Sequence, residues 1–105
     1  MEQQDITRRI KELESSRLNP SGYAQLGKLY MMLADALAGS VHPLRLDVVR
    51  RKGLSAYKDA LNRDPDVFID VAPLPDGYRE AIEAYRALRS DDKEAQKTRL
   101  MPALR

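Results

Sequence analysis

The stretch from Asn19 to Pro65 constrains the fold more than any other part of this chain. Asn19 is suited to cap a helix with its side chain, and Pro20 fits the first helical position because its missing N–H would have no partner there. Apolar residues then recur at steps of three and four, which predicts a helix of about five turns. Gly39 suits the left-handed backbone that often ends a helix. The residues on the apolar face are Tyr23, Leu26, Tyr30, Leu33 and Leu37.

A second helix is expected from Pro43 to about Asn62, after a short connection over residues 40–43. Its end is marked by Pro65, since the residue before a proline is biased away from the helical backbone. Gly53 in mid-helix costs about 1 kcal/mol relative to alanine, which makes sense if a neighbouring helix approaches closely there or the helix bends. The stretch 19–65 therefore predicts a hairpin of two long helices.

This hairpin resembles a tetratricopeptide repeat over roughly residues 19–65. In that family, small residues let two antiparallel helices pack closely and aromatic residues fill the gap between them. The spacing departs from the family, because 25 residues separate Gly27 from Gly53, whereas a 34-residue period leaves roughly 11. The residues that carry the resemblance are Tyr23, Leu26, Gly27, Tyr30, Gly53, Tyr57, Ala60 and Pro65.

Residues 1–18 are expected to form an N-terminal helix with a narrow apolar seam. Ile6, Ile10, Leu13 and Arg17 follow one another at alternating steps of four and three, while charged residues occupy the other faces. The seam either lies across the hairpin or pairs with a second copy or a partner as a short coiled coil. Two heptads fall short of the three or four that identify a coiled coil.

The remaining chain is interpreted as a connection over residues 66–76 and a C-terminal helix and tail over residues 77–105. Residues 67–71 favour strands, but no partner strand exists elsewhere, so they are expected to cap the end of the bundle in an extended or single-turn form. The next helix is expected to run from Gly77 to about Arg89. Residues 90–92, Ser90 to Asp92, either cap a last helix or continue the helix that precedes them. The predicted fold is one all-α domain over residues 1–105, a small antiparallel bundle of four to five helices.

Composition limits the classes of protein to which the chain can belong. With 43% hydrophobic and 32% charged residues, the 105-residue chain can form a small core. The net charge of +2 does not by itself indicate nucleic-acid binding. No cysteine is present, which fits a reducing cytoplasm. The polar first residues do not resemble a signal peptide, and the longest weakly charged run is too short to span a membrane.

No motif in the sequence indicates catalysis, a metal site or a cofactor. His42 is the only histidine and has no second ligand or triad partner. Asp64, Asp66 and Asp70 cluster, but they lack the spacing, glycine and closing glutamate of a calcium loop. The glycines are isolated, so no phosphate-binding loop is expected. We therefore expect neither an enzyme nor a cofactor.

The sequence favours a protein–protein interaction module, as an adaptor or chaperone-like subunit that binds a partner helix or peptide. One alternative is nucleic-acid binding through the basic residues between Arg45 and Lys58, and another is a homo-oligomer joined through Ile6, Ile10 and Leu13. The candidate partner-binding residues are Met31, Met32, Arg50, Arg51 and Phe68. The basic residues of the first alternative are Arg45, Arg50, Arg51, Lys52 and Lys58.

Overall fold

The computed structural model describes residues 2–100 and the side chains as far as Asp92, and in this part of the chain every regular element is a helix. This confirms the all-α class. The helices are α1 (Gln3–Glu14), α2 (Pro20–Leu37), α3 (Pro43–Arg63) and α4 (Asp76–Leu100).

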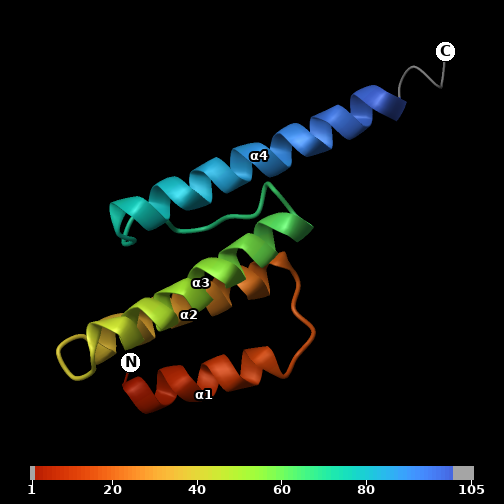
Figure 1. Cartoon of the computed structure of the whole chain (residues 1–105). Helices are drawn as coiled ribbons and strands as arrows, with labels where there is room; N and C mark the ends of the chain where they lie inside the picture. The colour runs from red at the N-terminus through yellow and green to blue at the C-terminus, as the bar shows by residue number, and fades with distance from the viewer. Residues whose placement is uncertain (1, 101–105) are drawn as a thin grey trace.

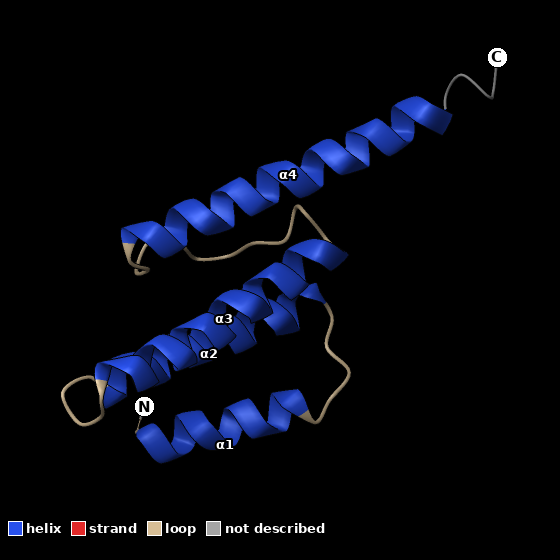
Figure 2. Ribbon diagram, in the orientation of Figure 1, coloured by secondary structure: helices blue, strands red, loops and turns tan. Residues whose placement is uncertain are grey.

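The helices lie side by side in an elongated molecule that measures 61 × 29 × 20 Å (Figure 1). Neighbours in sequence pack on one another: α1 on α2, α2 on α3 and α3 on α4. The first three helices alternate in direction. α4 instead runs parallel to α3, because the long connection over residues 64–75 first returns along the bundle (Figure 2).

The ends of the central hairpin follow from local chemistry. The side chain of Asn19 accepts a hydrogen bond of 2.7 Å from the backbone N–H of Gly22, and Pro20 occupies the first helical position. Gly39 has a φ of 84° in the turn after α2, as expected for a residue tolerant of the left-handed backbone. His42 caps α3, since its Nδ1 accepts from the N–H of Leu44.

α2 and α3 approach each other closely at Gly27 and Gly53. A Cβ on Gly27 would lie 2.8 Å from Cδ1 of Tyr57, nearer than real Cβ contacts allow. Since no side chain separates the helices at this point, Tyr57 fills the space beside the crossing and is only 2% exposed. The sequence predicted a close neighbouring helix at Gly53, and α2 is that helix.

α1 packs along the hairpin with its apolar seam facing inward. Ile6, Ile10 and Leu13 are buried in one cluster with Leu26 and Leu29 of α2. Within this chain the seam therefore packs on the hairpin, the first of its two expected arrangements, and pairing with a second copy through it stays a prediction.

α1 also ends earlier than expected, at Glu14. The hydroxyls of Ser15 and Ser16 donate to the carbonyls of Lys11 and Glu12, which ends the helix before Arg17. Arg17 is consequently outside the seam to which the sequence assigned it, and it is exposed.

α4 docks on the far side of α3 through its first half. Ile82 is fully buried, the hydroxyl of Tyr85 donates to Oδ1 of Asn62 at 2.6 Å, and Nζ of Lys58 lies 5.4 Å from the centre of the Tyr85 ring. Arg86 donates to the carbonyl of Pro65 and so ties the connection to α4. The helix continues to Leu100, beyond the predicted end near Arg89. The tail expected over residues 93–105 is therefore helical as far as Leu100, and residues 101–105 lie outside the described residues.

Candidate partner-binding groove

Two adjacent hollows form a groove between α2 and the connection over residues 64–75. They measure about 280 and 260 Å³, and Lys28, Tyr57 and Asp70 line both of them. The first hollow continues along Ser21, Ala24, Gln25, Phe68 and Ile69, and the second along Met31, Met32, Asp35, Pro73 and Leu74. We call this continuous surface the groove.

The α2 wall of the groove is one stripe of the helix. Ser21, Gln25, Lys28, Met32 and Asp35 recur at steps of three and four, so their side chains share one face. The stripe contains small, polar and flexible side chains between the apolar stripes that pack on α1 and α3. Because no helix covers it, this face stays open to a partner.

The opposite wall is the connection, held between two turns. The N–H of Val67 donates to the carbonyl of Asp64, and the N–H of Leu74 donates to the carbonyl of Val71. Between these turns, Val67 and Ile69 are buried while Phe68 and Asp70 are exposed. This alternation is typical of an extended chain with one face on a core. The buried residues join Tyr57, Leu61 and Ile82 in the second apolar cluster.

Tyr57 lies between the two walls, and the pKa of its phenol depends on burial and charge in the groove. Burial and, to a smaller extent, the negative charge of Asp70 raise the pKa of Tyr57 to about 12. The Asp70 carboxylate thus acts on the phenol within a partly desolvated space.

Three charged groups of the groove have no ion-pair partner among the described residues. The ion pairs of the described chain lie elsewhere, and none includes Lys28, Asp35 or Asp70. Asp70 accepts a hydrogen bond from the N–H of Ala72. All three residues are exposed, so their charges are accessible to a partner.

The structure brings three of the five sequence-predicted contact residues to this groove. Phe68 is 81% exposed at one end of it, and Met32 is half-buried in its wall. Met31 lines the second hollow but is only 8% exposed, so it belongs mainly to the core. Arg50 and Arg51 line neither hollow.

The basic residues of α3 do not form one continuous face. Arg45 and Lys52, seven residues apart, share the outer side of the helix. Arg51 pairs with Asp47 at 3.1 Å, Lys58 stacks on Tyr85, and Arg50 is half-buried. A face of Arg45 and Lys52 alone offers few contacts to a nucleic-acid backbone.

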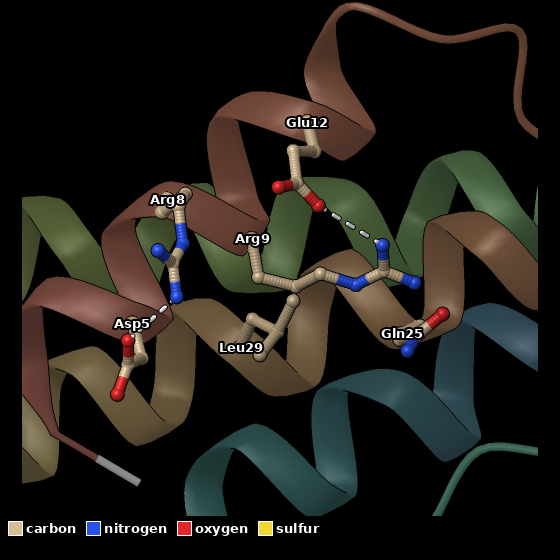
Figure 3. Close-up of a pocket in the computed structure, with 6 residues that line it drawn as sticks. All are labelled: Asp5, Arg8, Arg9, Glu12, Gln25 and Leu29. Atoms are coloured by element: carbon tan, nitrogen blue, oxygen red, sulfur yellow. Dashed lines mark hydrogen bonds and ion pairs between the residues drawn. The ribbon is translucent and has the colours of Figure 1, made fainter.

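A separate hollow of about 560 Å³ lies between α1 and α2, where Arg9 reaches over Leu29 towards Gln25 (Figure 3). Its walls are charged, but the charges are paired within α1. Arg8 contacts Asp5 at 2.7 Å, and Arg9 contacts Glu12 at 3.2 Å. This pairing leaves no uncompensated charge to attract a ligand.

Other kinds of site find little support in the part of the chain that the structure describes. No group of three or more histidine, cysteine or acidic side chains there is placed to hold a metal ion. Apart from Tyr57, no residue with a polar or charged side-chain group is buried among the described side chains. None of the described helices combines the length and apolar character needed to cross a bilayer.

The sequence reasoning missed the charged residues of the groove. Lys28, Asp35 and Asp70 look like ordinary surface residues until the connection folds back beside α2. The sequence signal for the α2 wall is the stripe of α2 that lies between its two apolar stripes and carries neither core residues nor regular ion pairs. No signal in the sequence located the opposite wall.

Comparisons with known proteins found no matching family model, no similar curated protein and no similar solved structure.

Proposed function

We propose that the protein is a non-catalytic interaction module, an adaptor or accessory subunit that binds a peptide segment of a partner protein in the groove. The observation that carries this proposal is the exposed aromatic ring of Phe68 at the edge of a partly apolar groove. Large aromatic side chains are enriched at protein interfaces, and folded chains normally bury them.

The size of the hollows also supports a peptide. Each is smaller than the roughly 300–1,000 Å³ of typical small-molecule pockets, at about 280 and 260 Å³. Two hollows of this size in succession suit two side chains on the same face of a peptide rather than one compact ligand. The apolar atoms of Met32, Tyr57 and Pro73 offer contact area, and methionine adapts its shape to different partners.

The resemblance of the hairpin to a tetratricopeptide repeat remains part of this proposal. It is supported by the close approach of α2 and α3 at Gly27 and Gly53, with Tyr57 beside the crossing. A cytoplasmic location is also part of the proposal, and a chain without cysteines is compatible with a reducing compartment.

A selection from a random peptide library displayed on phage, with the purified chain as target, tests the proposal. Enriched peptides should bind the wild-type chain and lose most of their affinity for Phe68→Ser. The matched control is Leu44→Ser, which removes another exposed apolar side chain, 70% exposed and outside the groove. Enriched peptides that bind all three proteins equally would place the binding site elsewhere, and a failure to enrich any peptide would contradict the proposed function.

A further inference from the structure

We infer that the groove selects an extended peptide with a basic side chain, which pairs with the backbone of residues 68–71 and lies against Asp35 and Asp70. The inference rests on the proposed function and adds the conformation and the charge of the partner segment.

The backbone N–H groups of residues 68–71 have no partner among the described residues, whereas the carbonyl of Val71 already accepts from the N–H of Leu74. Among the described hydrogen bonds, the two flanking turns use the N–H groups of Val67 and Leu74, but none uses an N–H from residues 68–71. Backbone donors and acceptors in an extended segment form a row that a second extended chain can join, as in strand addition to a sheet edge. The alternating burial from Val67 to Asp70 fixes the faces of this segment, so its edges point sideways along the surface.

The two hollows fit the repeat of an extended peptide. Alternate side chains of such a peptide point to the same face, about 7 Å apart. The hollows are adjacent and share Lys28, Tyr57 and Asp70, so side chains two positions apart in one peptide can fill both of them.

The charge of the second hollow selects a basic side chain. Its apolar lining comes from Met31, Met32, Tyr57, Pro73 and Leu74. Asp35 and Asp70 stand there against the single positive charge of Lys28, and none of the three has an ion-pair partner in the described chain. Lysine and arginine match this combination, because their aliphatic stems pack on apolar atoms while their charged ends reach a carboxylate.

The test uses a positional library of soluble seven-residue peptides, in which the central residue is fixed and the others vary. We expect the wild-type chain to bind pools with central arginine or lysine about five-fold more tightly than pools with central glutamate or leucine. The double variant Asp35→Asn/Asp70→Asn should lose this preference, although the amide oxygen introduced at position 70 can still accept the hydrogen bond from Ala72. The control variant Asp5→Asn/Glu12→Gln removes two carboxylates from the hollow between α1 and α2 and should keep the preference.

Backbone pairing is tested by amide hydrogen exchange with the best peptide bound. Two alternate amides among residues 68–71 should exchange more slowly in the complex, while the other two change little. Peptides that each carry one N-methyl group on the backbone should bind more weakly when the methyl group is at every second position, and as tightly as before when it is at the positions between.

The outcomes separate the inference from the proposed function. Peptides that bind in the groove without a basic preference, or without protection of alternate amides, would overturn the inference and leave the interaction module standing. A chain that binds no peptide pool above the level of Phe68→Ser would overturn both.

Discussion

Gly27 and Gly53 place the backbones of α2 and α3 in direct contact. A Cβ on Gly27 would lie 2.9 Å from the carbonyl oxygen of Gly53, and a Cβ on Gly53 would lie 3.1 Å from the carbonyl oxygen of Gly27. The contact is therefore reciprocal, and it brings Tyr57 against α2 at the base of the groove.

Replacing Gly27 with alanine should lower the free energy of unfolding by about 2 kcal/mol, because the strain of overpacking exceeds the gain in helix propensity. Urea denaturation followed by circular dichroism measures this change. Gly77→Ala is the matched control, since its new Cβ meets no atom within 4 Å, and it should be neutral or slightly stabilising. Equal stability of Gly27→Ala and the wild type would show that the helices do not cross this closely.

The packing of α1 predicts that Ile6→Ala destabilises the fold. Ile6 is 2% exposed, and loss of a buried isoleucine side chain typically costs about 2–4 kcal/mol. Leu44→Ala, at a residue that is 70% exposed, should change stability by less than about 0.5 kcal/mol. Light scattering on the same proteins tests the self-association alternative. If Ile6→Ala kept the stability of the wild type but turned an oligomer into a monomer, the seam would be a self-association surface.

The raised pKa of Tyr57, about 12 in the folded chain against the ordinary value of 10.0, predicts a loss of stability in alkali. The unfolded chain releases this proton first, so the stabilising contribution is complete below pH 10 and declines as the pH rises towards 12. The total loss is on the order of 2–3 kcal/mol. Tyr57→Phe should remove this part of the pH dependence, as measured by urea denaturation at a series of pH values between 8 and 11. If the free energy of unfolding of the two proteins changed in the same way with pH, the raised pKa of Tyr57 would be contradicted.

Tyr30 should act in the same direction, since burial and the neighbouring Glu14 also raise its pKa. The Tyr57→Phe variant therefore retains some alkaline destabilisation. The difference between it and the wild type isolates the share that comes from Tyr57.

The docking of α4 should depend much more on Ile82 than on Tyr85. Ile82→Ala removes a fully buried side chain and should cost about 2–4 kcal/mol. Tyr85→Phe removes only the hydrogen bond to Asn62, which is worth about 1 kcal/mol. Native-state hydrogen exchange of the α4 amides measures both effects. If Tyr85→Phe accelerated exchange in α4 as much as Ile82→Ala, polar contacts rather than burial would hold the helix.

The hairpin was predictable from the sequence because its boundaries depend on neighbouring residues. The structure begins α2 at Pro20 and α3 at Pro43, as expected, and it ends α3 one residue beyond the predicted Asn62. Caps and prolines act within one turn, so a linear reading is sufficient there.

The ends of α1 and α4 were less predictable, since the polar residues there can either end a helix or continue it. Ser15 and Ser16 bond back to α1 and end it early. Near the other end of the chain, Arg89 contacts Asp92 at 3.3 Å across one helical turn, so the polar residues after Arg89 continue α4 instead of stopping it.

The groove could be predicted only in part, because it is made by residues distant in sequence. The sequence identified Phe68 and Met32 as candidate contacts. It did not separate Met32 from the buried Met31, nor did it place Asp70 across from Lys28. Both distinctions depend on the path of residues 64–75 over the hairpin, which is set by packing rather than by local preference.

The two ends of the described chain lie far apart along the molecule. The start of α1 lies near the loop that joins α2 to α3, while α4 ends beyond the opposite end of the hairpin (Figure 1). The start of α1 and the end of α4 consequently lie towards opposite ends of a molecule whose longest dimension is 61 Å. A tension applied through the termini would pull α1 and α4 lengthwise along their neighbours, so many side-chain contacts would have to slide together before either helix came away.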